Sequence, residues 1–365
     1  MRIKDLLCCI EQIAPVSLQE GFDNSGVQVG NINQEAKAAL LCIDVTENVV
    51  DEAIALGCNL VISHHPLAFK SFKSLTGRTY IERCMMKACK HDLVIYAAHT
   101  NLDNAAEGIN YYLAKMFGLQ HIRILDAQKD GLLKLVTFVP HSHADQVRSA
   151  IFNAGGGNIG KYDSCSYNLE GKGTYRAGTE AKPFSGEIGK LHTEEEVRIE
   201  TVLPAFKQSD ALQALLAVHP YEEPAYDFYP LKNEWGGAGS GIVGTLPEEM
   251  VEEDFLYQVK DILRLSVVQH SACRNRMVRD VAICSGSGSF LIPKAIGYGA
   301  DVFITGEAKY NDFYDVEDKL LLAVVGHYES EIFTKNVFYD IISEKYPTFA
   351  LYMSGTDENP VRYLL

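Results

Sequence analysis

The sequence lacks any long apolar segment: no stretch approaches the ~18 consecutive apolar residues that a membrane-spanning helix needs. A secretory leader is not expected either, since the first twenty residues include acids and no small-residue cleavage site follows them. Basic residues are few, with 33 Lys and Arg against 48 Asp and Glu, giving a net charge of −15. Because so acidic a surface repels phosphate backbones, we expect no nucleic-acid binding through a general basic face. These absences predict a soluble, cytoplasmic protein.

Paired cysteines are also missing. The nine cysteines include no C-x-x-C pair, and most lie in apolar segments, as Cys42 and Cys284 do. This pattern indicates buried thiols and argues against both a disulfide framework and a thiolate zinc site. With 365 residues, 47% of them hydrophobic, the chain has the composition of a globular protein and the length of about two domains.

Short apolar segments alternate with amphipathic helical patterns in both outer parts of the chain. The apolar segments are residues 39–45, 60–63, 93–98, 278–284, 302–305 and 321–325. Strands that are buried on both faces read as continuous apolar segments, and their alternation with helices is typical of parallel sheets. We therefore predict an α/β fold built from two similar halves.

The middle of the chain follows a different order. From 127 to 233 the pattern reads strand, helix, two strands, helix, strand, which is the ferredoxin-like β-α-β-β-α-β unit. The Gly/Ser-rich stretch 236–244 then suits a linker back into the first fold. We predict an α/β domain made of 1–126 and 234–365, interrupted by a small inserted domain at 127–233.

Side chains that bind metals follow almost every predicted strand. In chain order they are Asp44, His64, His65, His99, Asp103, Glu307, His327 and Glu331. In an open parallel sheet, ligands collect beyond the carboxyl ends of the strands, so we expect these side chains to converge. Adjacent residues of an extended chain point in opposite directions, which predicts that His64 and His65 serve two different ions.

Three histidines and two carboxylates among these residues form a nitrogen and oxygen ligand set: His64, His65, Asp103, His327 and Glu331. His327 and Glu331 stand one helical turn apart, and Asp103 adds a carboxylate that could bridge two ions. Such a set suits Zn, Fe, Mn, Ni or Co. Two ions about 3.5–4 Å apart would support a hydrolytic displacement. A single histidine at a strand end is usually only a hydrogen-bonded surface residue, and it is the convergence that favours a metal site.

Three further motifs have simpler interpretations. The turn Gly286–Gly288 could cradle a phosphate, but it lacks the spacing and the Lys of a P-loop, and a tight strand-to-helix turn is the default. Glu194, Glu195 and Glu196 are expected to form a solvated turn before a strand. The aromatic segment 219–230 is expected to pack at a strand end or a subunit contact.

Five sequence blocks carry a resemblance to a known family. They are FDNSGVQVG (22–30), SHHPLAF (63–69), HTNLDNAAEGIN (99–110), ICSGSGSFLIPKAIGYGADVFITGEAKYND (283–312) and GHYESE (326–331). Together they resemble the Nif-three-like family, whose members are often called GTP cyclohydrolase 1 type 2 homologues or dinuclear-metal-centre hexameric proteins. The segment 127–233 is similar to the PII-like or CutA-like insert of a longer subgroup, most of all in HPYEEPAYD.

The resemblance implies two divalent metal ions per subunit. Matched block by block, the family's ligands fall on His64, His65, Asp103, His327 and Glu331. His99 matches a position that lines the site, and Glu307 and Asp44 match polar positions near the cavity. The resemblance also implies a toroidal homohexamer whose sites face an interior chamber. The identity of the metal stays open, and a nucleotide-like substrate is one candidate.

The leading functional hypothesis is a metal-dependent hydrolase of the GTP cyclohydrolase-like type. A metal-activated water would attack an electrophile, and the catalytic residues His99 or Glu307 would move protons. The alternative is a non-enzymatic metal-binding regulator or metal-delivery protein whose PII-like insert senses a small ligand. A purely structural assembly ranks last because it gives the ligand cluster no purpose.

Overall fold

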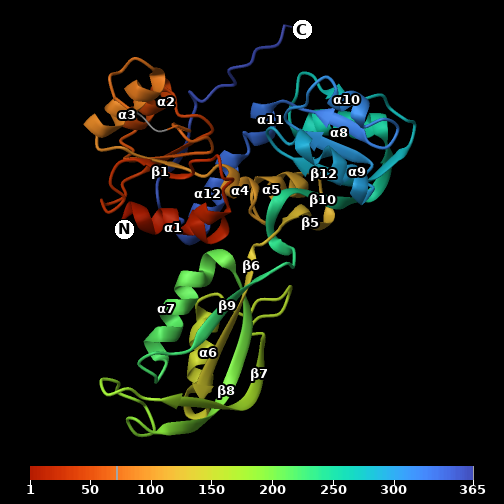
Figure 1. Cartoon of the computed structure of the whole chain (residues 1–365). Coiled ribbons are helices and arrows are strands. Elements are labelled where there is room, and N and C mark those ends of the chain that lie inside the picture. Colours follow the sequence, from red (N-terminus) through yellow and green to blue (C-terminus); the bar gives the residue numbers. More distant parts are fainter. Residues whose placement is uncertain (71–72, 365) are drawn as a thin grey trace. The chain divides into compact units, whose positions relative to one another are not determined.

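The computed structural model describes residues 1–70 and 73–364, which form two compact units (Figure 1). The larger unit, which we call the scaffold, consists of Met1–Ala127 and the segment from Gly237 onward. The smaller unit, the insert, is Gln128–Gly236. Each unit has its own hydrophobic core.

The first sheet of the scaffold has five strands in the order β1-β4-β3-β2-β15. They are β1 (Gly26–Val29), β2 (Ala39–Cys42), β3 (Leu60–Ser63), β4 (Val94–Ala97) and β15 (Leu351–Met353). Strands β2, β3 and β4 run parallel, and every residue in them is buried, as the continuous apolar segments predict. Strand β1 pairs antiparallel with β4.

The second sheet has six strands in the order β11-β14-β13-β12-β10-β5. They are β5 (Gln120–Gln128), β10 (Trp235–Val251), β11 (Gln269–His270), β12 (Met277–Cys284), β13 (Val302–Thr305) and β14 (Leu321–Val324). Strands β12, β13 and β14 are parallel and mirror the role of β2, β3 and β4. The mixed α/β fold predicted from the alternating segments is confirmed.

Helices pack against these sheets. The scaffold contains α1 (Ile3–Ile13), α2 (Glu47–Ala55), α3 (Tyr80–Lys90), α4 (Thr100–Asp103), α5 (Ile109–Met116), α8 (Glu252–Ile262), α9 (Ile292–Tyr298), α10 (Asp312–Asp315), α11 (His327–Glu331) and α12 (Thr334–Lys345), with 3-10 turns η1 (Val16–Leu18) and η4 (Ser289–Leu291). Thr46 and Thr79 cap α2 and α3, because each hydroxyl accepts a hydrogen bond from a first-turn amide. Across 1–70 and 73–364, no helix has both the length and the apolar character needed to cross a bilayer.

The end of the chain returns to the first half of the scaffold. Strand β15 adds to β2 in parallel, with Tyr352 opposite Leu40. Helix α12 packs beside α1, at the base of the same half (Figure 1). The carboxyl-terminal residues therefore complete the first sheet, and both halves belong to one compact unit.

The Gly/Ser-rich stretch 236–244 is part of a strand, and the linker predicted from its composition is wrong. It lies in β10, between β12 and β5. A Cβ on Gly239 would lie 2.2 Å from the backbone oxygen of Asp126 in β5. The glycines of this stretch thus permit close approach of two strands, which composition alone does not distinguish from flexibility.

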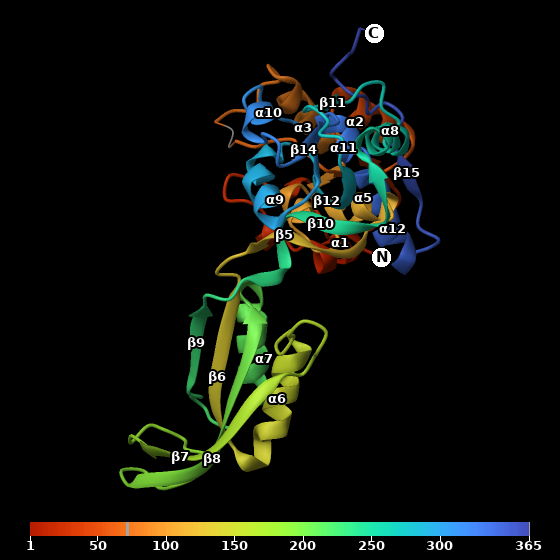
Figure 2. The ribbon, with the colours of Figure 1, turned by 90° about the vertical axis from the view of Figure 1, so that its right-hand side faces the viewer.

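The insert is a four-stranded sheet with two helices on one of its faces (Figure 2). Its elements are β6 (Leu132–Pro140), η2 (His141–His143), α6 (Ala144–Asn153), β7 (Ser166–Arg176), β8 (Leu191–Pro204), η3 (Ala205–Lys207), α7 (Gln208–Val218) and β9 (Tyr226–Leu231). The strand order is β7-β8-β6-β9, and all pairs are antiparallel. The β-α-β-β-α-β order read from the sequence is present.

Candidate metal centre

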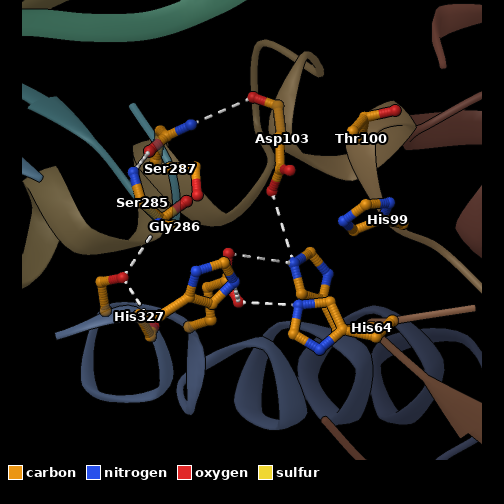
Figure 3. A network of polar contacts seen from close by, with 12 residues as sticks. His64, His99, Thr100, Asp103, Ser285, Gly286, Ser287 and His327 are labelled. Carbon is orange, nitrogen blue, oxygen red and sulfur yellow. Dashed lines mark hydrogen bonds and ion pairs between the residues drawn. The ribbon is translucent and has the colours of Figure 1, made fainter. Parts of the chain in front are cut away.

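Polar side chains meet beyond the carboxyl ends of five short strands of the scaffold (Figure 3). In order from β2, β3, β4, β13 and β14, these side chains are Asp44, His64 and His65, His99 and Asp103, Glu307, and His327 and Glu331. Each of these strands has four buried residues, and because the strands within each sheet run parallel, the chain leaves them at the same edge of that sheet. Local strand length therefore sets where the ligands gather.

His64 and His65 lie side by side, and the expectation that they point in opposite directions is wrong. Their ring centroids are 5.0 Å apart with the planes tilted by 42°. The physical reason is that β3 ends at Ser63 and the chain bends at the two histidines, so the alternation of an extended strand no longer applies. His99 stands 5.3 Å from both rings, in edge-on contact.

Four histidines of the centre are oriented in the same way. In each, Nδ1 is hydrogen bonded to an oxygen outside the centre: Ala98 O for His64 at 2.9 Å, Asp44 Oδ1 for His65 at 2.9 Å, Asp23 Oδ1 for His99 at 2.8 Å and Glu307 Oε1 for His327 at 2.9 Å. A carboxylate or carbonyl on one ring nitrogen fixes the tautomer that leaves the other nitrogen free to bind a metal. All four Nε2 atoms are thus available as ligands.

The carboxylate of Glu331 lies at the middle of the cluster. Its Oε1 is 3.6 Å from His64 Nε2, and its Oε2 is 3.0 Å from His65 Nε2 and 3.1 Å from His327 Nε2. Asp103 Oδ1 lies 3.6 Å from His64 Nε2 on the first of these sides (Figure 3). Glu331 therefore divides the ligand atoms into one set around His64 and Asp103 and another around His65 and His327.

Two buried atoms of the centre, His64 Nε2 and Asp103 Oδ1, have no hydrogen-bond partner among the described residues and lie 3.6 Å apart. Burial raises the pKa of Asp103, which shows how poorly the site solvates this carboxylate. Buried polar atoms normally find partners, so two unpartnered ones that face each other call for an explanation. A cation bound between them would satisfy both, and the nitrogen and oxygen donors suit a divalent metal ion.

Charges inside the centre shift the pKa values of its side chains. Burial lowers the pKa of His65, but hydrogen bonds with Asp44 and Glu331 outweigh it and raise the pKa to about 10. The same balance of burial and contact with Glu331 raises the pKa of His327 to about 8. Burial alone would raise the pKa of Glu331, but the nearby imidazoles, first that of His64, hold it well below its usual range. Protons on these imidazoles occupy the place of a cation, so ion binding would release them.

The glycine-rich turn after β12 gives Glu331 its space. A Cβ on Gly286, whose φ is +59°, would lie 2.2 Å from Glu331 Oε1. The amides of Ser285, Gly286 and Gly288 all donate to side chains of the scaffold. These amides are therefore not free to hold a phosphate. The turn instead leaves the space that the carboxylate of Glu331 occupies.

Two cavities open onto the centre. The first has a volume of about 720 Å³, and exposed aromatic side chains on its wall are Phe22, Phe69, Tyr80 and Phe290. Its described lining contains no Lys or Arg, and it includes Ser285, whose buried Oγ has no hydrogen-bond partner. The second cavity, of about 620 Å³, shares His65 and His327 with the first and is also lined by Lys309. The centre is thus accessible from a cavity whose wall carries both aromatic and polar side chains.

The structure brings the five predicted ligands together, with Asp44 and Glu307 behind two of them. Sequence reasoning missed Asp23, whose side chain is fully buried and holds His99 through Oδ1. Its other oxygen accepts hydrogen bonds from the backbone amide and the hydroxyl of Thr100. Burial raises the pKa of Asp23, but the bonds from His99 and Thr100 outweigh it and lower the pKa. Asp23 precedes an edge strand without an apolar segment, so only its place in the block 22–30 could have pointed to it.

Comparisons with known proteins identify the family of this chain. The family model described as Duf34/NIF3 (NGG1p interacting factor 3) matches residues 1–360. A protein of Halalkalibacterium halodurans named "GTP cyclohydrolase 1 type 2 homolog" is 40% identical over 329 residues, which are 90% of this chain and 88% of the relative. A Bacillus subtilis protein of the same name is 38% identical over 367 residues, 99% of this chain and 98% of the relative.

A solved structure is similar over the whole chain. The crystal structure of a Bacillus cereus protein related to NIF3 superposes with a TM-score of 0.84 at 35% identity, covering 100% of this chain and 99% of that one. The matched family model, the named relatives and the shared architecture all point to one conclusion. The chain belongs to the Duf34/NIF3 family.

Proposed function

We propose that the scaffold holds two divalent metal ions and is a metal-dependent hydrolase. The observation that carries this proposal is the place of Glu331, whose Oε1 faces His64 and whose Oε2 faces His65 and His327. One ion would take His64, Asp103 and Glu331 Oε1, and the other would take His65, His327 and Glu331 Oε2. Glu331, rather than Asp103, would then be the carboxylate that both ions share.

Two such ions would supply Lewis acidity for a polarised carbonyl or phosphoryl oxygen and lower the pKa of a water molecule. The chain's own residues divide the remaining work. His99 borders both groups, and with its Nδ1 committed to Asp23 it has Nε2 for moving a proton. Glu307 has one oxygen on His327 Nδ1 and the other on Ser287 Oγ, so we assign it to positioning His327 rather than to proton transfer.

The larger cavity suggests the kind of substrate. Aromatic side chains line it, and the unpartnered hydroxyl of Ser285 can bond a polar edge. Since the described lining holds no Lys or Arg, only the ions themselves would neutralise a phosphate there. We propose a ring-containing electrophile, such as a nucleobase-like cyclic amide, as the class to screen first.

Metal content tests the centre directly. Plasma mass spectrometry on the wild-type chain, purified without added metal, should find about two ions per chain, by the two-ligand-set argument. Asp103→Ala should lose at least one of them, because it removes the carboxylate that faces His64. His91→Ala, at an exposed histidine after α3, serves as the matched control and should keep both. Wild-type protein that stays metal-free after reconstitution would remove the proposal.

Activity is tested separately on the metal-loaded chain. Nucleotides, phosphoesters and cyclic amides are incubated with wild type and with His99→Ala, and turnover is followed by liquid chromatography. We expect turnover of at least one class by the wild type and its loss in the variant. Bound metal without any turnover would leave the centre intact and refute the hydrolase.

A second candidate function is metal regulation or delivery, in which the insert acts as a PII-like or CutA-like sensor. The β-α-β-β-α-β order of the insert and a cavity of its own favour it. Rapid transfer of bound ions to a chromophoric chelator, together with no turnover, would support this candidate. The toroidal homohexamer stays a prediction, and sedimentation equilibrium of the full chain tests it.

A further inference from the structure

A third cavity lies within the insert and shares no lining residue with the two cavities of the scaffold. It has a volume of about 660 Å³, within the range of sites that bind small molecules. Strand residues such as Leu135, Val197 and Ile199 pack in the core with α6 and α7. Phe138, Glu196 and Arg198 alternate with such core residues along β6 and β8, so they stand on the face that the helices leave open.

Two glycines make room for this cavity. Gly171 and Gly173 lie in β7 opposite Glu196 and Glu194 of β8. Nothing lies within 4 Å of the place that a Cβ of Gly171 would take, whereas a Cβ on Gly173 would stand 2.1 Å from Glu196 Oε2. Glycine inside a strand weakens it, and it often marks a place where a ligand or another chain approaches closely. Here the two glycines leave space beside the carboxylate of Glu196.

Glu196 is that carboxylate, and the solvated turn predicted for it is wrong. It lies inside β8 and is only 8% exposed. Its Oε1 accepts a hydrogen bond of 2.7 Å from Tyr221 Oη. Register explains the difference: Glu196 faces the cavity, whereas Glu195 lies opposite Lys172, pairs with it and is exposed.

The partner of Glu196 is itself fixed in place. The backbone amide of Tyr221 donates to His219 Nδ1 at 3.1 Å, and His219 Nε2 donates to the backbone oxygen of Phe138 at 3.1 Å. Burial lowers the pKa of His219, which keeps the ring neutral and able to accept at Nδ1. These hydrogen bonds give His219 and Tyr221 of the aromatic segment 219–230 a structural role. Through Tyr221 they also hold the carboxylate of Glu196 in a fixed position.

Aromatic rings surround the carboxylate. Those that line the cavity are Phe138, Tyr175, Phe184 and Tyr221. Tyr221 lies 6.3 Å from Tyr175 and 5.9 Å from Phe184 between ring centroids. Aromatic faces carry negative potential, and rings arranged around an acidic group recognise organic cations.

The charges of the lining favour a cation as well. The acids are Glu170, Glu196, Glu222 and Glu223, and the bases are Lys172, Arg176 and Arg198. Lys172 pairs with Glu195 at 2.9 Å and Arg198 with Glu200 at 2.8 Å, and neither of those acids lines the cavity. Two of the three bases are therefore paired with acids outside the lining, the Nε of Arg198 alone being buried without a hydrogen-bond partner among the described residues, and the acids of the lining outnumber its bases by four to three.

We propose that the insert binds a small organic cation, an ammonium or quaternary ammonium group on a compact apolar body. The positive charge lies against Glu196, and the rings of Tyr175, Phe184 and Tyr221 enclose the apolar part. This site needs no metal ion and does not depend on hydrolysis in the scaffold.

A matched pair of probes tests the charge requirement. Choline and its uncharged carbon isostere 3,3-dimethyl-1-butanol have the same shape, and saturation-transfer NMR titrations on the full chain measure their binding. We expect choline to bind about tenfold more tightly than the isostere, in the range that cation–aromatic contacts give. Benzoate, a planar anion, should not bind. Absence of choline binding, equal binding of the two isosteres, or binding of benzoate would each overturn the proposal.

Variants then locate the site. Glu196→Gln keeps the shape of the side chain and should weaken choline binding about tenfold while leaving the isostere unchanged. Since a buried substitution can disturb folding, Phe184→Leu, at a ring that is 48% exposed, provides a second reading and should weaken choline at least about twofold. Glu187→Gln, at an exposed acid that pairs with Lys190 outside the cavity, is the control. Unchanged choline binding in both cavity variants would refute this location.

Discussion

The candidate metal centre of the scaffold and the cavity of the insert both bury a glutamate, but they satisfy it in different ways. Glu196 accepts a hydrogen bond from Tyr221, which is anchored by a neutral histidine. Glu331 is surrounded by imidazole nitrogens, and His64 Nε2 and Asp103 Oδ1 on one side of it have no hydrogen-bond partner among the described residues. The insert thus completes its site with its own side chains, whereas the scaffold leaves buried ligand atoms without partners.

This difference separates two kinds of binding site. A carboxylate that already has a hydrogen-bond partner is stable without a ligand. Its site can therefore stay empty and bind a ligand weakly and reversibly. An unpartnered group in a buried place is costly unless something compensates it. We therefore expect the scaffold's centre to bind its ions tightly and the insert's cavity to bind its cation reversibly.

The largest expected effect comes from turning a satisfied buried glutamate into an unsatisfied one. Glu252 pairs with Arg274 at 2.8 Å, and both side chains are buried. Arg274→Ala would remove the guanidinium that pairs with Glu252 Oε1, and Glu252 would keep only the hydrogen bond that its Oε2 accepts from the backbone amide of position 274. We expect the free energy of unfolding of the scaffold to fall by about 3–5 kcal/mol in urea titrations.

The control for this change is an exposed pair in the same half. Arg279 lies 3.6 Å from Glu249. The side chain of Arg279 is 62% exposed, and that of Glu249 is 50% exposed. Arg279→Ala should lower the free energy of unfolding by less than about 1 kcal/mol. If both variants lowered the free energy of unfolding by the same amount, a buried carboxylate without its ion-pair partner would not be specially destabilising in this protein.

A smaller effect is expected from the oxygens that orient the histidines. Asp44→Asn and Glu307→Gln replace the carboxylates that hold Nδ1 of His65 and His327. Each should weaken metal affinity about 10- to 100-fold, because the imidazoles lose their fixed orientation and part of their basicity. Competition with a chromophoric zinc chelator measures the change.

Asp51→Asn provides the comparison for these two variants. Asp51 is an exposed acid of α2 that pairs with Lys87, and it contacts no histidine of the centre. Its substitution should leave zinc affinity unchanged. If all three variants bound zinc as the wild type does, the orienting role of Asp44 and Glu307 would be lost.

The smallest effect concerns two buried hydroxyls around the glycine-rich turn. Ser285 Oγ has no partner, whereas Thr305 Oγ1 accepts from the amide of Gly288 at 3.1 Å. Ser285→Ala should therefore raise the free energy of unfolding by about 0.5–1 kcal/mol, and Thr305→Val should lower it by about 1–2 kcal/mol. Thermal unfolding of both variants measures the difference, and a loss of stability in Ser285→Ala would show that its hydroxyl is satisfied.

Much of the scaffold could be predicted because its strands are short and buried on both faces. Segments such as 39–42, 60–63 and 302–305 are apolar throughout, so they reveal both their type and the edge where ligands follow. The same rule placed His64 and His327 in one neighbourhood. It could not give their orientation, because that depends on where β3 stops and the chain bends.

The parts that escaped prediction depend on pairing across the chain. Strand β10 resembles a linker in composition, and only its contact with β5 shows why glycine is needed at Gly239. Asp23 lies in a polar segment with no periodicity, yet it is buried through its bonds to His99 and Thr100. Glu196 differs from Glu195 only in the face of β8 on which it stands, which one sequence does not reveal without the register.

The close approach of Gly286 to Glu331 has a consequence for how this protein can evolve. Every other amino acid adds at least a Cβ, which would stand 2.2 Å from the carboxylate that the two ligand sets share. The two positions are therefore coupled: a side chain at position 286 would force the carboxylate of Glu331 to move, and the left-handed φ of +59° disfavours such a side chain in any case. In a relative known only from its gene, a residue other than glycine at this position would indicate that the carboxylate has moved or has been lost.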